Sequence, residues 1–361
     1  MKDKFISLSF ISILIGFFIL NIFLPDKEIS YSERRKLKSL PNITLQSLIE
    51  GKTIDEFEDY TLDQFAFRDN FRGLKSYIDF NVFNKLDTND IFILDNNIFK
   101  IDYPLKENEI LKFASKLNNI TSKYLTNNNN VYLSIIPDKN YYLEDSTHLK
   151  IDYDHLISLV NSKIENIKYI DLTNDLNLND FYYTDLHWKQ ENLGNVVDTL
   201  SNEMNFNITN KNYKVQSYAP FYGAYYGQSA LNIKPDTINY LSNDIIENAI
   251  VTNLEDESFK YVYNKDKLGT LDSYDVFLSG ATPFIEIINP LYEGTKELII
   301  FRDSFGSSIA PLLIEGYSKI TLIDLRYTNL ASIENLIEFN NKDVLFLYST
   351  LIVNGSSILK D

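Results

Sequence analysis

The chain contains no cysteine, and this absence removes several kinds of chemistry at once. Without thiols there can be no disulfide, no thiolate nucleophile and no cysteine-based zinc site. Histidine is also scarce, because only His148, His155 and His187 occur among the 361 residues. Any reaction that needs an imidazole base therefore has three candidates.

Basic residues are too few to balance the acidic ones. The 34 lysines and arginines stand against 50 aspartates and glutamates, which gives a formal net charge of −16. The one basic cluster is Glu33-Arg-Arg-Lys-Leu-Lys38, and an acidic chain of this kind is not drawn to nucleic acid. Walker-type loops and dinucleotide-binding glycine patterns are missing as well.

One long apolar run is present, and it lies near the N-terminus at residues 5–24. A run of roughly 20 residues matches the thickness of a bilayer core. Lys2 and Lys4 precede it, so the positive-inside rule places the N-terminus in the cytoplasm and the rest of the chain outside. A cleavable signal peptide is the alternative, but no small-x-small site precedes Pro25. We predict an uncleaved single-pass anchor over residues 1–24, with the globular part extracytoplasmic at the cell membrane.

The next segment, residues 25–88, is predicted to form a helical N-terminal region. Apolar residues at spacings of three and four indicate one or two amphipathic helices within it. Phe65, Phe67 and Phe71 lie on this pattern, and we expect them to be core residues.

A domain over residues 89–361 is predicted to be an α/β sheet. Short apolar strands, such as 131–136, alternate with helical patterns along this part of the chain. Two later apolar segments, 319–324 and 343–348, are typical of buried parallel strands. The pattern is lost between residues 205 and 293, where aromatic residues and glycines gather, so we predict a β-rich insertion there.

A serine stands at a turn between a buried strand and a helix. Residues 298–301 are apolar, Arg302-Asp-Ser-Phe-Gly306 follows, and a helix is predicted to start at Ser307. Such a turn lifts the Ser304 hydroxyl out of the sheet, and the first N–H groups of the helix point at any oxyanion that forms. The same pattern arises by chance in many α/β domains, so the serine needs a base elsewhere in the chain.

That base could come from Phe181-Tyr-Tyr-Thr-Asp-Leu-His-Trp188. Asp185 and His187 are two residues apart, so in an extended segment they project to one side. A carboxylate there fixes the tautomer of the imidazole and stabilises the imidazolium. A helix predicted over 189–204 would place the pair at a second strand-to-helix junction. A structural histidine bonded to a local carboxylate is the alternative.

The other two histidines lack an acid at this spacing in a comparable position. His148 and His155 lie among Asp145, Asp152 and Asp154, which predicts surface loop residues more than a metal site because the spacing is irregular. His187 is therefore the one credible base. We predict that its ring lies within hydrogen-bond reach of Ser304, at roughly 2.6–3.2 Å.

These residues also carry a family resemblance. Asp185-Leu-His-Trp188 resembles the Asp-His-His-Trp signature of bacterial DHHW proteins and the Asp-x-His-Trp of alginate O-acetyltransferases of the J and X type, which are similar to SGNH hydrolases. Leu186 replaces the second histidine, and Arg302 stands where many relatives carry glycine. Further pieces fall in the family's order and extend the likeness over most of the chain: Ser32-Glu-Arg-Arg-Lys-Leu37 with Leu40-Pro41, Asp63-Gln-Phe-Ala-Phe-Arg-Asp69, Ile136-Pro-Asp-Lys139, Phe221-Tyr-Gly223, Arg302-Asp-Ser-Phe-Gly306 and Asp324-Leu-Arg-Tyr327.

The resemblance implies an SGNH-hydrolase-like sheet with flanking helices and a Ser-His-Asp triad. Ser304 would be the nucleophile, His187 the base and Asp185 its orienting acid, with the oxyanion held by backbone N–H groups of Ser304 and a nearby glycine. The implied reaction is O-acyl transfer, with acetyl groups passing to an exported polysaccharide. A membrane-bound O-acyltransferase is implied as the acyl donor, and no metal or cofactor is needed.

Four further positions are expected near the substrate from the same resemblance: Tyr222, Gly223, Arg302 and Arg326. A structural salt bridge is an equal alternative for Arg326. Two other functions also fit these residues. An extracytoplasmic carbohydrate esterase would use the same triad with water as acceptor, and a non-catalytic component of a polysaccharide export or modification complex would not need the triad at all.

Overall fold

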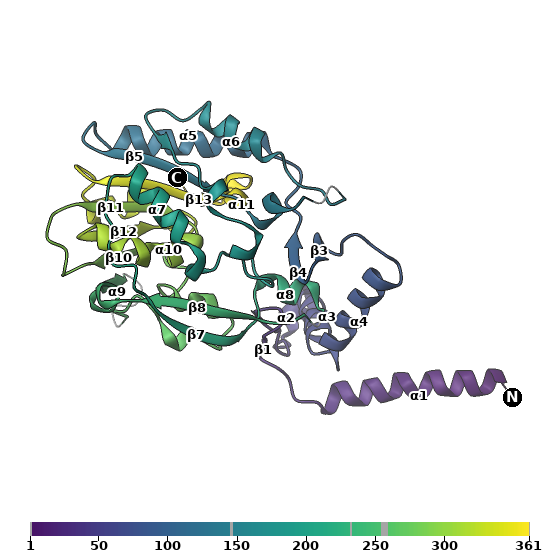
Figure 1. The fold of residues 1–361 in the computed structure, drawn as a ribbon. Coiled ribbons are helices and arrows are strands. Elements are labelled where there is room, and N and C mark those ends of the chain that lie inside the picture. The colour runs from purple at the N-terminus through teal and green to yellow at the C-terminus, as the bar shows by residue number, and fades with distance from the viewer. Residues whose placement is uncertain (1, 145–146, 232, 254–258, 361) are drawn as a thin grey trace. The chain divides into compact units, whose positions relative to one another are not determined.

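The computed structural model describes residues 2–144, 147–231, 233–253 and 259–360. These residues form two compact units (Figure 1). The N-terminal unit comprises Met1–Asn89 and Tyr226–Ile233, and the sheet unit comprises Asp90–Tyr225 and Lys234–Asp361. The short segment Tyr226–Ile233 lies within the stretch predicted as an insertion, yet it belongs to the N-terminal unit.

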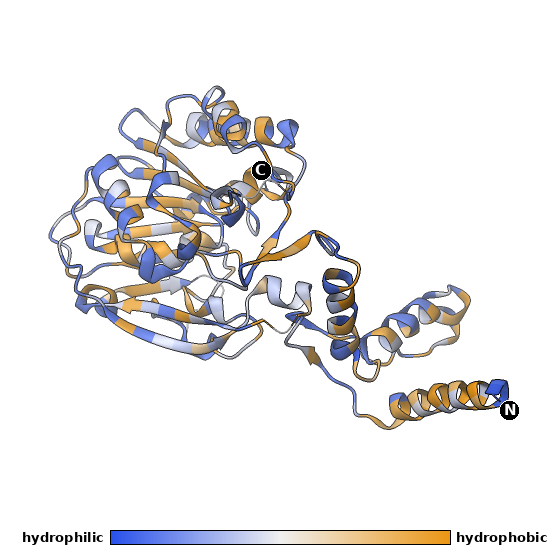
Figure 2. Cartoon of the chain, turned by 45° about the vertical axis from the view of Figure 1, so that its right-hand side comes forward, coloured by the Kyte–Doolittle hydropathy of each residue, from blue (hydrophilic) through white to orange (hydrophobic). Residues whose placement is uncertain are grey.

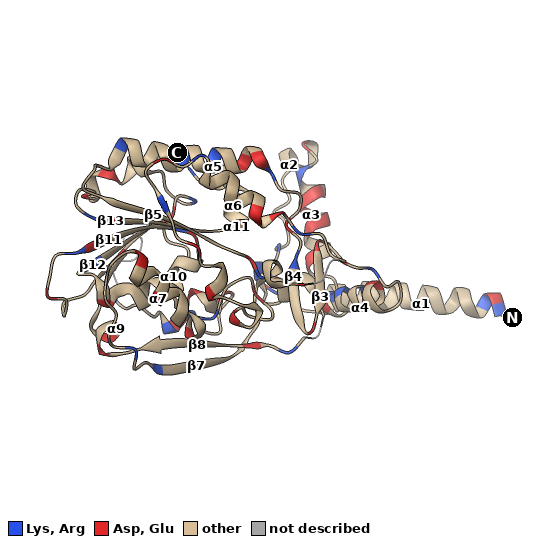
Figure 3. Cartoon of the chain, turned by 45° about the horizontal axis from the view of Figure 1, so that its top comes forward, with Lys and Arg blue, Asp and Glu red and all other residues tan. Residues whose placement is uncertain are grey.

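The N-terminal unit is mostly helical. Its elements are α1 (Lys2–Phe23), β1 (Ile29–Ser30), β2 (Arg35–Lys36), α2 (Leu45–Ile49), α3 (Lys52–Asp63) and α4 (Arg68–Asn81). Helix α1 is long and apolar enough to cross a membrane, and none of its described side chains is buried. Most of this helix has the hydrophobic colour in Figure 2, and Figure 3 shows charged residues only at its N-terminal end. A signal sequence would meet the same criteria of length and apolar composition, so these criteria do not separate it from a membrane anchor.

The phenylalanines predicted as core residues of this unit lie at its surface. Phe65, Phe67 and Phe71 are 41%, 57% and 45% exposed. Phe65 and Phe71 each contact Phe17 of α1, with ring centroids 5.7 Å apart in both pairs. The prediction was wrong: all three side chains are exposed, and Phe65 and Phe71 pack beside an apolar helix that is itself exposed.

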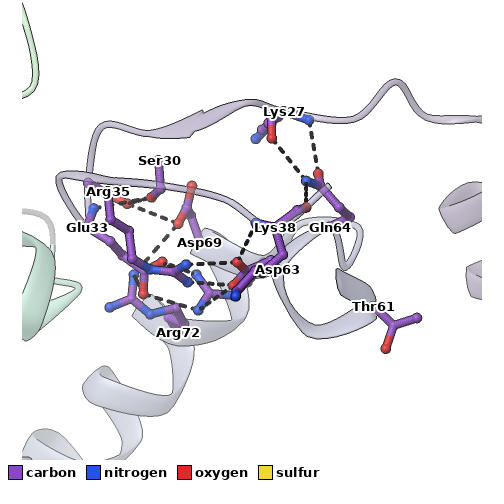
Figure 4. A network of polar contacts seen from close by, with 12 residues as sticks. Lys27, Ser30, Glu33, Arg35, Lys38, Thr61, Asp63, Gln64, Asp69 and Arg72 are labelled. Atoms are coloured by element: carbon purple, nitrogen blue, oxygen red, sulfur yellow. Dashed lines mark hydrogen bonds and ion pairs between the residues drawn. The ribbon is translucent and has the colours of Figure 1, made fainter. Parts of the chain in front are cut away.

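Two acidic side chains connect the segment after α1 to helices α3 and α4 (Figure 4). Arg35 grips Asp63 with two hydrogen bonds of 2.8 and 2.5 Å, and Arg68 grips Glu33 with two of 2.6 and 3.1 Å. The Lys38 N–H also donates to Asp63, at 2.9 Å. The Arg35 hydrogen bond is the main reason that the pKa of Asp63 falls to about 2, from an ordinary 3.8.

This pKa predicts how acid affects the unit. A carboxyl whose folded pKa is depressed stabilises the fold above its unfolded pKa, and that contribution is lost as the pH falls from about 4 towards 2. Asp63→Asn should therefore reduce the acid sensitivity of the segment around Lys38, and Glu33, whose pKa is also lowered, accounts for what remains. The measurement is hydrogen-exchange protection of residues 30–40 between pH 2 and 5, corrected for intrinsic exchange.

The matched control for this prediction is Asp55→Asn, which removes an exposed acid on the same helix, α3. Its protection should follow that of the wild type. Equal acid sensitivity in Asp63→Asn and in the wild type would contradict the prediction.

The sheet unit is built on seven strands in the order β6-β5-β13-β11-β12-β10-β9 (Figure 1). Strands β6, β5, β13, β11 and β12 are parallel to one another, and β10 runs antiparallel to both of its neighbours. The predicted strands at 319–324 and 343–348 are β12 and β13, and both are parallel to β11 as expected. The strands are β5 (Asn130–Ile136), β6 (Lys168–Tyr169), β9 (Ile250–Asn253), β10 (Phe284–Ile288), β11 (Glu297–Arg302), β12 (Lys319–Ile323) and β13 (Asp343–Ser349).

Helices cover both faces of this sheet because successive strand residues point in opposite directions. Leu298 and Ile300 of β11 pack in the same cluster as residues of α7 (Gly194–Glu203) and α10 (Phe305–Leu313). The alternate residues Ile299 and Phe301 pack with α5 (Glu107–Tyr124), α6 (Tyr153–Asn161) and α11 (Thr350–Val353) on the other face. The predicted α/β sheet with flanking helices is confirmed.

Residues 205–293 divide between two places in the structure. Strands β7 (Lys214–Phe221) and β8 (Asp236–Ser242) form a separate antiparallel ribbon, whereas β9 and β10 extend the main sheet. The short helices α8 (Ala224–Ser229) and α9 (Asp244–Asn248) also belong to this stretch. Strands β3 (Ile91–Leu94) and β4 (Asn97–Lys100) form a further antiparallel hairpin.

Candidate active site

Ser304 stands between the carboxyl end of β11 and the start of α10. Asp303 fixes this turn, since its carboxylate accepts the N–H of Phe305 at 3.0 Å and the N–H of Ser349 at 2.9 Å. The second bond ties the turn to the carboxyl end of β13, the neighbouring strand. Ser304 is therefore held on a rigid corner of the sheet, as a nucleophile requires.

His187 connects the serine to an acid. Its Nε2 lies 2.7 Å from the Ser304 Oγ, and its Nδ1 lies 2.5 Å from an Asp185 carboxylate oxygen. The first distance falls inside the predicted range. The Asp185 carboxylate also accepts backbone N–H groups from His187 at 3.0 Å and Ala224 at 2.6 Å, so it acts as an acceptor throughout. The Nδ1 position is then the donor, and the lone pair on Nε2 faces the serine hydroxyl.

The segment that carries this pair is a tight loop, which differs from the extended strand that the spacing predicted. A single antiparallel bridge between Phe181 and Trp188 closes it, and the Tyr182 N–H donates to the His187 carbonyl at 3.1 Å. The chain turns inside the loop because the Asp185 carboxylate accepts the His187 N–H. A short 3₁₀ turn, Gln190–Asn192, separates this loop from α7.

Aromatic rings hold the plane of the imidazole. Tyr274 stacks on it with ring centroids 3.8 Å apart and an interplanar angle of 8°, and Phe305 lies at 4.9 Å. Ser308, one helical turn after Ser304, accepts hydrogen bonds from the Tyr274 hydroxyl and the Trp188 indole, each at 2.8 Å. The ring therefore has little freedom to turn away from the serine.

Sequence reasoning missed Tyr274 and gave Ser308 no role. Tyr274 is one of 25 tyrosines and lies where the sequence has no regular period, so no signal marked it. Ser308 did carry a signal, because a residue four positions after Ser304 on a helix lies on the same face.

Arg302 has a structural place beneath the site. Its side chain is fully buried, and it donates to the carbonyls of Gly280 and Thr282, at 3.3 Å each. It also lies 3.5 Å from the carboxylate of the buried Asp324. Burial lowers the pKa of Arg302 and the Asp324 carboxylate opposes that shift. Arg302 has no exposed surface, and its contacts in the structure are with protein groups.

Gly306 packs on Arg302 and does not present its N–H to the site. A Cβ at Gly306 would lie 2.6 Å from the Arg302 Cβ, so only glycine allows this contact. The Gly306 N–H donates to the Asp303 carbonyl at 3.1 Å. In the described part of the chain, the Ser304 N–H has no such backbone acceptor.

The other residues expected to contact substrate differ in their exposure and in their protein partners. The Arg326 guanidinium binds the Asp324 carboxylate twice, at 2.9 and 2.6 Å, which is the salt bridge named as its alternative. The Gly223 N–H donates to the Thr184 hydroxyl at 2.9 Å, and a Cβ there would lie 2.3 Å from the Asp185 Cβ. Tyr222 presents 41% of its surface.

Within the described ranges, no group of three or more acidic or histidine side chains could hold a metal ion. His155 pairs with Glu107 at 2.9 Å, and the ring of His148 stacks on Phe92 at 3.8 Å. Asp145, which belonged to the irregular acidic cluster in the sequence, lies outside the described residues.

Comparison with known proteins places the fold. No family model matches the sequence, and no curated protein matches it either. Among solved structures, a DHHW family protein from Eubacterium siraeum is 20% identical over 75% of this chain and 94% of its own, with a TM-score of 0.64. Bacillus cereus PatB1 is 18% identical over 75% of this chain and 97% of its own, with a TM-score of 0.60. A second PatB1 structure, with a sulfonyl adduct, is 17% identical over 75% and 100%, with a TM-score of 0.59.

These structural similarities define the fold class of the sheet unit. The sheet unit has an SGNH-hydrolase-like fold, with an Asp-His-Ser hydrogen-bond chain at the carboxyl end of its sheet. More narrowly, it is the fold of the Eubacterium siraeum DHHW family protein, which agrees with the resemblance that the Asp185-Leu-His-Trp188 motif carries.

Proposed function

We propose that this protein is a serine-dependent O-acyltransferase that acetylates an exported cell-surface polysaccharide. The observation that carries the proposal is the continuous chain from the Asp185 carboxylate through the His187 ring to the Ser304 hydroxyl, with contacts of 2.5 and 2.7 Å. An acid, a fixed tautomer and a hydroxyl in this order are what nucleophilic acyl transfer needs.

In the first half-reaction, the Ser304 oxygen attacks the carbonyl carbon of the acyl donor while its proton passes to His187 Nε2. The negative charge that develops on the carbonyl oxygen is stabilised by the N–H of Ser304. The Asp185 carboxylate stabilises the imidazolium. Nε2 then returns the proton to the leaving oxygen as its bond to carbon breaks, and the acyl group remains esterified to Ser304.

In the second half-reaction, a sugar hydroxyl takes the place of the leaving group. His187 removes its proton as its oxygen attacks the acyl carbon, and the bond from carbon to the Ser304 oxygen breaks with return of that proton. Stacking by Tyr274 keeps the imidazole in one plane through both halves. A single ring can therefore serve as base and acid in turn.

The proposal also includes the surroundings of the reaction. Helix α1 anchors the chain with its globular part outside the cytoplasm, and a membrane-bound O-acyltransferase supplies the acyl group. Tyr222 is the proposed acceptor contact, because it is partly exposed and directly precedes Gly223, which packs on Asp185. Arg326 binds the Asp324 carboxylate, which also contacts Arg302, and Arg302 precedes Ser304 by two residues.

The experiment that tests the function uses the full chain in detergent micelles. It is incubated with an activated acetyl ester and excess oligosaccharide acceptors, and the products are separated by mass spectrometry. We expect acetylated oligosaccharide, and an enzyme population that carries one acetyl group on the peptide containing Ser304.

Two results would contradict the proposal in different ways. Free acetate as the only product, despite excess acceptor, would identify a carbohydrate esterase with the same triad. Absence of both acetyl-enzyme and turnover with a range of ester donors would favour a non-catalytic component of an export complex.

A further inference from the structure

Lys139 is a buried lysine that the mechanism above does not use. It begins a 3₁₀ turn, Lys139–Tyr142, three residues after β5 ends at Ile136, and its residue is only 2% exposed. Burying a lysine is costly unless its ammonium finds partners. The hydrogen-bond partners of the Lys139 ammonium lie in the backbone just before Asp185.

The ammonium donates to the backbone that immediately precedes Asp185. Its Nζ lies 2.9 Å from the Tyr182 carbonyl oxygen and 3.2 Å from that of Tyr183. It also lies over two rings, 5.2 Å from the centroid of Phe99 and 5.5 Å from that of Tyr225. Carbonyl oxygens and aromatic faces both favour a cation.

A buried carboxylate, that of Asp236, accepts hydrogen bonds from the N–H groups of the same backbone segment. The Asp236 carboxylate accepts the N–H of Tyr183 and the N–H of Thr184, each at 2.8 Å, and the Thr184 hydroxyl at 2.6 Å. Lys139 and Asp236 therefore hold the carbonyl side and the N–H side of one short segment. That segment ends at Asp185.

We propose that Lys139 is a positioning residue of the triad, which fixes the backbone before Asp185 and sets one positive charge against the carboxylate that orients His187. This inference rests on the proposed function for its catalytic meaning. It assigns to Lys139 a task that Ser304, His187 and Asp185 do not perform, because none of the three supplies a positive charge while the imidazole is neutral.

The charges around Lys139 support this task. Burial lowers its pKa to about 7, and the carboxylates of Asp185 and Asp236 oppose that shift. Lys189 adds to the lowering, and the buried Asp138 opposes it. The ammonium is therefore charged on the acid side of neutrality, which is where a histidine base changes its protonation.

The test follows the titration of His187 by ¹⁵N NMR of the imidazole in the full chain in micelles. Assignment needs only His148→Gln and His155→Gln, because the chain has three histidines. Lys139→Gln keeps a donor for the two carbonyls and removes the charge, whereas Lys139→Arg keeps the charge. Lys342→Met is the matched control, because Lys342 is a buried lysine that bonds Glu297 at the opposite end of the sheet.

Loss of a neighbouring positive charge favours the imidazolium, so the His187 midpoint should move upward in Lys139→Gln by about half a pH unit or more. It should stay near the wild-type midpoint in Lys139→Arg and in Lys342→Met. The acid limb of kcat/KM for acyl transfer should move upward by the same amount in Lys139→Gln. A role in folding alone would lower the rate equally at every pH.

An unchanged His187 midpoint in a folded Lys139→Gln protein would overturn the proposal. An equal shift of the midpoint in Lys139→Gln and Lys139→Arg would overturn it too, since charge would then have no part. The NMR titration needs no turnover. A shifted midpoint in a chain that transfers no acyl group would therefore refute the proposed function and leave the role of Lys139 standing.

Discussion

Ser304→Ala should lower the rate of acyl transfer by about a thousandfold or more, because it removes the atom that forms the acyl-enzyme. The fold should be unchanged, since the wild-type hydroxyl is held by His187 and caps no helix. The measurement is the initial rate of acetyl transfer, together with capture of acetyl groups on the protein. Thermal unfolding of both proteins checks that stability is equal.

Ser307→Ala is the matched control for this substitution. Ser307 lies three residues later, in the first turn of α10, and its buried hydroxyl has no hydrogen-bond partner among the described residues. Removing that hydroxyl should leave activity within about twofold and stability equal or slightly higher. Comparable activity in Ser304→Ala and the wild type would remove Ser304 from the mechanism.

Gly223→Ala should lower activity by roughly a hundredfold, although Gly223 itself supplies no reacting group. The added Cβ would lie 2.3 Å from the Asp185 Cβ, 2.5 Å from the Thr184 carbonyl oxygen and 2.6 Å from the Asp185 Cα. Two of these atoms are backbone, so no side-chain rotation relieves the overlap. Asp185 must move, and displacements of about 1 Å at a catalytic group carry losses of this size.

Whether kcat or KM changes identifies the cause of the lost activity. We expect kcat to fall with little change in KM, because Asp185 orients the base and does not bind substrate. Gly194→Ala is the control, since a Cβ at the start of α7 meets no atom within 4 Å. Full activity in a folded Gly223→Ala protein would show that Asp185 tolerates displacement, and the triad geometry would then be unnecessary.

Sequence patterns predicted the parts of this fold in which neighbours along the chain decide the structure. Helix α5 carries apolar residues at helical spacing, and turn residues around Asp95 separate β3 from β4, so both elements follow from local signals. The parallel strands β12 and β13 were also predictable, since strands buried on both faces are continuous apolar runs.

The same patterns predicted Asp185, His187 and Ser304 as a set, but for a partly different reason. A spacing of two suggested an extended strand, whereas the acid and the imidazole meet because the Asp185 carboxylate turns the loop. Both conformations bring the two side chains together. The motif was therefore more informative than the secondary structure inferred from it.

Supporting residues escaped prediction because distant segments create their environments. Tyr274 reaches the imidazole from a 3₁₀ turn, Ser273–Val276, that has no periodic pattern. Arg302 suggests an active-site cation because it stands beside the serine in the chain, yet the carbonyls of Gly280 and Thr282 and the Asp324 carboxylate enclose it. Burial of a charge depends on which remote groups neutralise it, and a sequence does not show that.

The segment Tyr226–Ile233 has a consequence for dissecting this protein. It is encoded between strands β7 and β8, but it belongs to the N-terminal unit, where the Arg72 side chain donates to the Gly227 carbonyl at 2.6 Å. The polypeptide chain thus passes from one unit to the other three times: after Asn89, within α8 and before Lys234. A fragment beginning at Asp90 would keep the whole triad but lose the binding surface for this segment, so the two units are not separable as linear pieces of the gene product.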